Sequence, residues 1–293
     1  MNSSLLKGGI QNKRSFTSTD FTGKNWENFD MKGKNFTNSA FPKNLIVRNR
    51  NLKNTIFDGV LFRNCSFVDC NLEGCSFVGI RVEDTILDLS GSNLKNAKLN
   101  GIDTSYIQLN DCNLAGAIFD RATMNNFDFS GKDLTDCSFV RTSLINCKWN
   151  NVFMSGTTFK HANLGGSKGK NIKMDGCNFK ECRMKGIKFE DVSSVKSRFK
   201  RIFGTNGTWI KWFALKCDMR HAQLENCSIT YCTFDGSNFI RTNINNSEFK
   251  NNKMKNTKCH QFYFENAKDL RGTDFSYVNM ERRDLNINLT DCV

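Results

Sequence analysis

A bulky apolar residue recurs at every fifth position along almost this whole chain. The period runs through four registers, separated by slips of one, two and one residues: Phe16 to Ile46, Leu52 to Leu87, Leu89 to Phe264, and Leu270 to Leu285. They hold 55 five-residue units, of which 49 have Leu, Ile, Val, Met, Phe or Trp at the centre, although only 39% of the chain is hydrophobic. A period of five fits neither a helix nor a simple strand. The chain must therefore turn regularly and return one residue per unit to a shared interior.

The position two residues before each centre takes a small side chain. Eleven of the 13 cysteines occupy it, and Ala, Ser or Thr holds it elsewhere, as at Ala162, Ser197 and Thr157. Free cysteine packs as a small hydrophobe. No Cys-x-x-Cys pair occurs, and a spacing of five is not a zinc signature. We therefore predict buried packing cysteines and no metal site, cofactor or disulfide framework.

Two units show a family resemblance most clearly. Cys112-Asn113-Leu114-Ala115-Gly116 and Ala162-Asn163-Leu164-Gly165-Gly166 resemble the A(D/N)LXX consensus of the pentapeptide-repeat family. The resemblance covers residues 16–285. It implies an all-β fold, a right-handed quadrilateral parallel β-helix with five residues per side, twenty per coil and about 13–14 coils. The central and minus-two side chains would point inward, and the other three would face solvent.

This resemblance implies one domain, at 16–285, between a polar leader at 1–15 and a tail at 286–293. Residues twenty positions apart should then stack on one another and bury a continuous core. One predicted core column is interrupted only by Met219, and consists of Phe119, Phe139, Phe159, Phe179, Phe199 and Phe239.

Residues 200–216 lose the consensus and contain two of the four tryptophans. One interpretation is a protruding contact loop in which Trp209, Lys211 and Trp212 touch a membrane or a partner. The other is a degenerate coil, because Phe199 and Met219 stay one full coil apart. A second irregular segment, residues 165–170, lacks the spacing of a phosphate-binding loop.

Positive charge is concentrated in the middle of the chain. Residues 137–217 contain 16 Lys and Arg against four acidic residues, a net +12 of the total +13. We predict that this range presents a basic face to an anion or partner, through Lys160, Lys180, Arg198, Lys200, Arg201 and Arg220. An acidic protein or acidic membrane is one candidate partner, nucleic acid is another, and a merely solvated face is the alternative. Inward-facing aromatics argue against nucleic acid, since few remain to stack bases.

Catalysis has few candidate residues. The three histidines are His161, His221 and His260, and no consistent nucleophile or carboxylate accompanies them. We predict no catalytic residue and no enzyme activity. The predicted function is a non-catalytic protein-interaction scaffold, a role that in some family members resembles that of a secreted bacterial effector.

Two alternative functions compete with this scaffold role. The first is protection of a type II topoisomerase, as in the quinolone-resistance branch, whose rods resemble DNA because they are acidic. The +12 midsection and the lack of a helical dimerisation segment after Leu285 oppose it. The second is direct binding of nucleic acid.

The expected location is the cytoplasm of the producing bacterium, or a host cell after specialised secretion. No apolar run approaches the length of a transmembrane helix, and residues 1–10 do not form a general secretory signal. A signal for a specialised system would lie in the polar leader.

Overall fold

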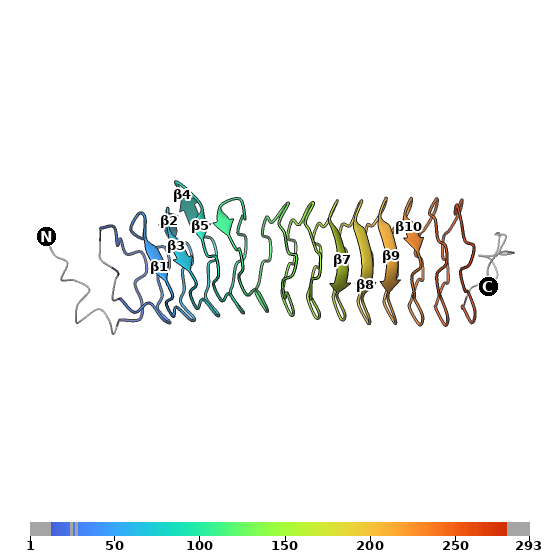
Figure 1. Cartoon of the computed structure of the whole chain (residues 1–293), viewed down its shortest axis with the longest axis horizontal. Coiled ribbons are helices and arrows are strands. Elements are labelled where there is room, and N and C mark those ends of the chain that lie inside the picture. The colour runs from blue at the N-terminus through green and yellow to red at the C-terminus, as the bar shows by residue number, and fades with distance from the viewer. Residues whose placement is uncertain (1–12, 24–25, 27–28, 280–293) are drawn as a thin grey trace. The chain divides into compact units, whose positions relative to one another are not determined.

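The computed structural model describes residues 13–23, 26 and 29–279, which form stacked parallel coils without a helix (Figure 1). They belong to two compact units, Met1–Met124 and Asn125–Val293. Bridges join residues twenty positions apart, as between Thr158 and Asn178, so one coil takes twenty residues. The predicted parallel β-helix is therefore confirmed. The predicted tail, the last residues of the final register and most of the leader lie outside the described residues.

A left-handed residue at each corner explains the period of five. The backbone φ is +60° at both His161 and Glu181. The amide of Ala162 donates back to the carbonyl of Phe159 at 2.9 Å, which closes a four-residue turn around His161. A single left-handed residue at the third position of such a turn is typical of type II. Four such corners per twenty residues make a coil with four five-residue sides.

Unit 1 contains short parallel strands arranged as two sheets. The register slips appear as longer pairing offsets: Asn35 pairs with Ile56 at an offset of 21, and Asn71 pairs with Asn93 at an offset of 22. The extra residues are accommodated while the stack continues. The sheet orders are β1-β3-β5-β6 and β2-β4, with bounds β1 Ile46–Arg48, β2 Leu61–Arg63, β3 Ser66–Val68, β4 Arg81–Glu83, β5 Leu87–Asp88 and β6 Ile107–Gln108.

The prediction that Ile46 is an inward centre is wrong. Ile46 is 64% exposed, whereas its neighbour Val47 is 6% exposed and belongs to the core. Successive residues of a strand face opposite sides, so only one of the two can point inward. The extra residue is inserted between Phe41 and Val47, five positions earlier than the sequence pattern indicated.

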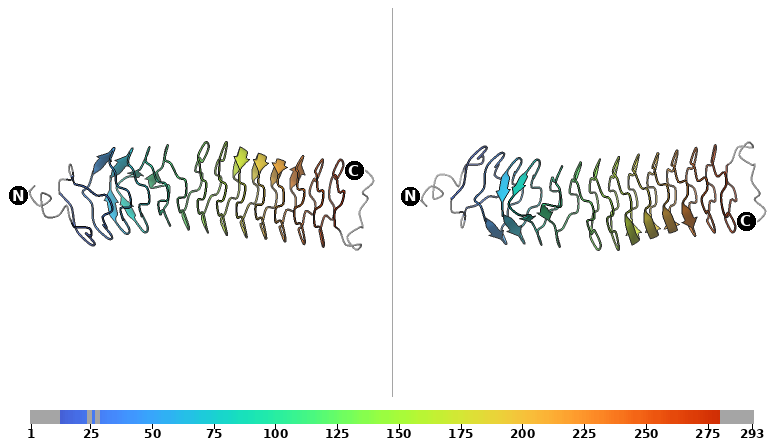
Figure 2. Two further views of the ribbon diagram at one scale, coloured as in Figure 1. Left: turned by 90° about the horizontal axis from the view of Figure 1, so that it is seen from below. Right: turned by 90° about the horizontal axis from the view of Figure 1, so that it is seen from above.

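Unit 2 contains a four-stranded parallel sheet in consecutive coils, visible side by side in Figures 1 and 2. The strands β7 (Lys168–Lys173), β8 (Lys188–Ser193) and β9 (Thr208–Phe213) each run through a corner, and β10 (Ser228–Thr230) is shorter. A left-handed residue bends each long strand at that corner, at Asn171, Asp191 and Lys211. The third register slip appears near the end, where Glu248 pairs with Asp269 at an offset of 21.

The predicted phenylalanine column forms part of the core of unit 2. The rings of Phe139, Phe159, Phe179 and Phe199 stack in succession with 4.8–5.1 Å between centroids and planes within 6°. Phe239 is buried in the same unit, and Phe119 is buried in unit 1. Ring spacing close to the strand spacing of about 4.8 Å means that each ring follows the backbone of its own coil.

The small inward slot has a polar role that the sequence pattern did not reveal. The hydroxyl of Ser197 donates to the carbonyl of Met174 at 2.6 Å and accepts the amide of Cys177 at 3.1 Å. The thiol of Cys177 likewise donates to the carbonyl of Met154 at 2.8 Å. Buried backbone carbonyls need such donors. Cys, Ser and Thr therefore suit the slot because they are small and carry a donor, not through size alone.

The predicted contact loop around Trp209 and Trp212 is wrong, because both side chains are only 1% exposed. Their rings stack with centroids 4.1 Å apart inside the coil, and the Trp212 indole donates to the Ser194 hydroxyl at 2.7 Å. Lys211 alone is exposed, at the corner of β9. Residues 200–216 thus form the degenerate coil of the other interpretation.

Neighbouring small residues provide the volume for these indoles. A methyl group on Gly207 would lie 2.6 Å from Nε1 of Trp209, and one on Gly204 would lie 3.2 Å from its ring. Trp212 occupies the minus-two slot, next to the small centre Ala214. Because interiors are close-packed, the large and small residues must change together. The consensus is lost here while the coil is kept.

Candidate functional site

One side of the unit 2 coils has far more cations than carboxylates at its outward positions, and we call it the cationic side. It comprises the outward positions of residues 137–141, 157–161, 177–181, 197–201, 217–221 and 237–241. Backbone hydrogen bonds hold these segments in register, as where the Glu181 amide donates to the Lys200 carbonyl at 3.0 Å. Its outward positions carry two carboxylates, Glu181 and Asp218, against Arg141, Lys160, Lys180, Arg198, Lys200, Arg201, Arg220 and Arg241. All six predicted partner-binding residues thus lie on one side.

Glu181 is surrounded by a histidine, a lysine and an arginine. Its carboxylate lies 3.1 Å from His161 Nδ1, 3.4 Å from Lys180 Nζ and 3.7 Å from Arg201 Nη1. Desolvation raises the pKa of Glu181, but the three neighbours outweigh it and the net pKa lies below the ordinary value. Glu181 is therefore ionised near neutral pH and offsets only part of the surrounding charge.

Arg220 is engaged by a carboxylate two residues earlier. Its Nε and Nη2 each donate to Asp218 at 2.7 Å in a bidentate pair. Burial raises the pKa of Asp218, but hydrogen bonds from Arg220 outweigh it and the pKa is lowered. Beyond this pair, desolvation and the charges of Arg241, Arg201, Lys200 and Arg220 lower the pKa of His221. The local potential is thus positive even with Asp218 ionised.

Among the residues that the structure describes, the remaining cations of this side form no ion pair. Within the described residues, no carboxylate lies within 4.0 Å of Lys160, Arg198 or Lys200. Arg198 is exposed, and its backbone bridges Asn178 and Asp218 in the neighbouring coils. Stacked like charges repel one another. A surface that keeps them unpaired is suited to an external anion.

A second lysine column, which was not predicted from the sequence, lies on another side of unit 2. Lys148 bridges Lys168, which pairs with Lys188 in the sheet of β7 and β8. Their twenty-residue spacing could have revealed the column. On the same side, Lys170 and Lys211 pair with Glu190 and Asp191. This side is more nearly balanced in charge than the cationic side.

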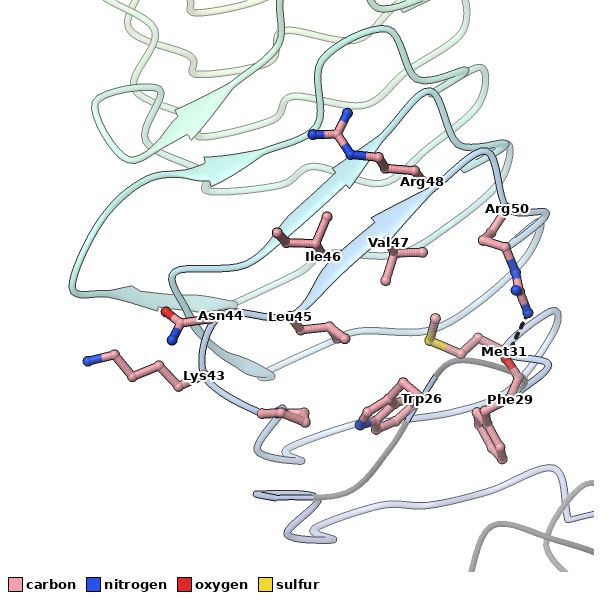
Figure 3. A pocket seen from close by; sticks show the side chains of 11 residues that line it. Trp26, Phe29, Met31, Lys43, Asn44, Leu45, Ile46, Val47, Arg48 and Arg50 are labelled. Atoms are coloured by element: carbon pink, nitrogen blue, oxygen red, sulfur yellow. Dashed lines mark hydrogen bonds between the residues drawn. The ribbon is translucent and has the colours of Figure 1, made fainter. Parts of the chain in front are cut away.

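Unit 1 has a pocket of about 450 Å³ beside β1 (Figure 3). Its wall contains Trp26, Phe29 and Met31, and Arg50 donates to the carbonyl of Phe29 at 3.5 Å. The residues described around it include aromatic, aliphatic, Lys, Arg and Asn side chains, but no acid, histidine, cysteine or hydroxyl. Apart from the Lys43 amine, the described lining has none of the usual nucleophiles or general bases.

The phosphate-loop-like segment at 165–170 is part of the regular coil. The Ser167 hydroxyl is buried and donates to the Leu144 carbonyl at 2.9 Å, while Lys168 begins β7. The segment precedes no helix that could orient amides towards a phosphate. Throughout the described residues, no group of three His, Cys, Asp or Glu side chains could hold a metal ion.

Parallel coils with four five-residue sides define a β-solenoid scaffold. The model of pentapeptide repeats matches this chain in eight copies, at residues 48–84, 88–131, 137–168 and 217–256, more than half of its length. The chain belongs to the pentapeptide-repeat family, as the resemblance predicted. The fold of this family is a non-enzymatic repeat scaffold.

The chain is also similar, at low sequence identity, to solved structures. HetL, a pentapeptide repeat protein involved in heterocyst differentiation regulation in the cyanobacterium Nostoc, is 12% identical with a TM-score of 0.32, over 94% of each chain. QnrB1, a plasmid-mediated fluoroquinolone resistance protein, is 16% identical with a TM-score of 0.26, over 82% of this chain and 90% of its own. No protein of curated function matches the sequence. Across the described ranges, no helix has the length and apolar character needed to cross a membrane.

Proposed function

We propose that this protein is a non-catalytic interaction scaffold whose cationic side binds an acidic surface of a protein or membrane. The observation that supports it is a set of cations on this side, Lys160 in one coil and Arg198 and Lys200 two coils further on, that form no ion pair among the described residues. A rigid backbone holds their spacing, so little backbone conformational entropy is lost on binding. No Phe, Tyr or Trp occupies an outward position of this side, which favours an acidic surface over single-stranded nucleic acid because the large aromatic rings on which bases usually stack are lacking there.

Topoisomerase protection has no supporting feature in this geometry. A protein that occupies the DNA site of an enzyme must present negative charge there, whereas this side presents eight cations and two carboxylates. Direct binding to duplex nucleic acid is a competing outcome, since phosphates are anions too.

A pull-down at low and moderate salt tests the proposal. The wild type is compared with a Lys160→Glu, Lys180→Glu, Lys200→Glu variant and with a matched control, Lys148→Glu, Lys168→Glu, Lys188→Glu. The two variants have the same net charge and differ only in the side that is reversed. We expect a partner that the first variant loses and the control retains. Equal loss would assign binding to overall charge, and equal retention would show that the cationic side is only solvated.

Two parallel measurements distinguish the kinds of partner. Binding to phosphatidylserine vesicles tests an acidic membrane, and binding to duplex DNA tests nucleic acid. DNA binding with a steep salt dependence that the first variant alone loses would replace the proposed acidic-surface function.

A further inference from the structure

A small apolar surface borders the cationic side, in the five-residue sides 192–196 and 212–216. We call Val195, Phe213 and Leu215 the apolar patch. Phe213 is 47% exposed, while Val195 and Leu215 are half-buried. The two sides are hydrogen-bonded neighbours, because Ser193 pairs with Phe213 and the Lys196 amide donates to the Leu215 carbonyl at 2.8 Å. The three side chains therefore occupy adjacent outward positions of two consecutive coils.

Two lysines join this patch to the cationic side. Lys196 and Lys216 occupy the corner at which the chain passes from one side to the next, and both are exposed. Neither has a carboxylate within 4.0 Å among the described residues. Arg198 follows directly on the far side of the corner, so the surface passes from an apolar centre to unpaired cations within a few residues.

Nothing in the described part of the chain covers Phe213. Phe153 makes an informative comparison, since it occupies the same outward position three coils earlier and is also 47% exposed. The ammonium of Lys173 lies over the Phe153 ring at 5.1 Å, whereas no ring or cation contacts Phe213 among the described residues. Phe213 is thus an aromatic side chain with its apolar surface open to solvent, next to positive charge.

Two carboxylates limit the patch along the stack. Asp175 lies one coil before Val195 and accepts from the Val195 amide at 2.7 Å, and Asp235 lies one coil beyond Leu215. An acidic partner would be repelled at both ends of the patch. Its negative groups must instead lie across the corner, over Lys196, Lys216 and Arg198.

We propose that the apolar patch and the adjoining cations together bind an amphipathic acidic segment of a partner protein. An apolar side chain of that segment covers Phe213, and its carboxylates pair with the corner lysines and the cationic side. An apolar centre with a charged rim is the usual anatomy of a protein interface. A phosphate backbone has no apolar group to place on Val195 and Leu215. This inference rests on the proposed function and specifies its partner class.

Selection from a displayed library of random peptides tests the inference. Wild-type protein should enrich peptides that combine Asp or Glu with large apolar residues. Synthesised winners are then titrated against the Phe213→Ser variant, which we expect to lower their affinity about tenfold. The matched control is Phe153→Ser, which removes an equally exposed ring and should leave the affinity unchanged. Circular dichroism of both variants checks that the coils stay folded.

The outcomes separate the two proposals. Acidic peptides without apolar residues, bound equally by the Phe213→Ser variant but lost on reversal of Lys160, Lys180 and Lys200, would overturn this inference and leave the proposed function intact. Enrichment of no peptide would overturn the inference, and the pull-down would then decide the proposed function alone. Phosphatidylserine vesicles that bind wild type but not the Phe213→Ser variant would assign the patch to a membrane and overturn the inference as well.

Discussion

The ring of Phe179 lies parallel to that of Phe159, with 4.8 Å between centroids and 2° between planes. Each ring belongs to a different coil, so the contact transmits packing from one coil to the next. Stability of such a stack is approximately a sum of contacts between neighbours. Removing one ring should therefore weaken two coil interfaces.

Replacement of Phe159 by alanine should lower the free energy of unfolding by about 3–5 kcal/mol, because it leaves a cavity between Phe139 and Phe179. Urea unfolding followed by circular dichroism measures the change. The control is Phe153→Ala, an exposed phenylalanine six residues earlier, which should cost much less. An unchanged urea midpoint for the Phe159 variant would show that the phenylalanine column does not contribute to the stability of the core.

Replacement of Gly169 by alanine should also destabilise unit 2. The added methyl would lie 2.7 Å from the carbonyl oxygen of Trp149 and 2.8 Å from its carbonyl carbon. Because the obstacle is backbone in the adjacent coil, the strain cannot be relieved by a side-chain rotation, and we expect a loss of about 1–3 kcal/mol. Thermal unfolding compares this variant with Lys168→Ala, whose side chain is exposed. Equal melting temperatures would contradict the close approach.

The buried thiols predict a loss of stability at alkaline pH. Burial raises the pKa of Cys147 and of Cys232 from 9.0 to about 12. Between these values the unfolded chain has released the thiol protons while the folded chain retains them. The free energy of unfolding should therefore fall as pH rises from about 9 towards about 12.

Paired unfolding curves isolate this effect from other alkaline titrations. Each is measured for wild type and for the Cys147→Ala, Cys232→Ala variant at a series of pH values. Alanine occupies the same slot at Ala162, so the variant should fold, and its stability should fall less steeply above pH 9. Parallel pH dependences would rule out the thiols as the source.

Removal of the Asp218 charge should strengthen binding of an anionic partner. Asp218→Asn retains an oxygen for the Arg220 amide but no longer neutralises the guanidinium. We expect the affinity to rise about two- to fivefold at low salt, and the gain to shrink as salt screens it. Titration of the partner identified in the pull-down measures the change. A weaker complex would instead place Asp218 itself in the contact.

The residues of the repeat largely determined the fold. A central apolar residue every five positions, with a small one two places earlier, predicted a chain that turns regularly around a shared interior. The family resemblance of those units implied the β-helix, its inward columns and the burial of Phe159 and Cys177. The pattern succeeds because each coil repeats one local geometry, so that periodicity in sequence becomes stacking in space. The register slips could also be predicted from the sequence, since an inserted residue displaces every later centre. The first insertion, however, lies five positions earlier than the pattern indicated.

Only the tertiary structure decided how the exceptions are resolved. In the sequence, Trp209 and Trp212 resemble a contact loop, because the glycines and the alanine near them depart from the repeat consensus. In the folded chain, Gly204, Gly207 and Ala214 belong to the same coil as the two indoles and leave the space that they occupy. The same holds for the charged residues. The sequence placed Lys180 and Arg220 in one column, but only the structure shows that they pair with Glu181 and Asp218. Lys160, Arg198 and Lys200 form no ion pair among the described residues. Compensating volumes and ion pairs depend on side-chain directions between neighbouring positions, which a five-residue period does not specify.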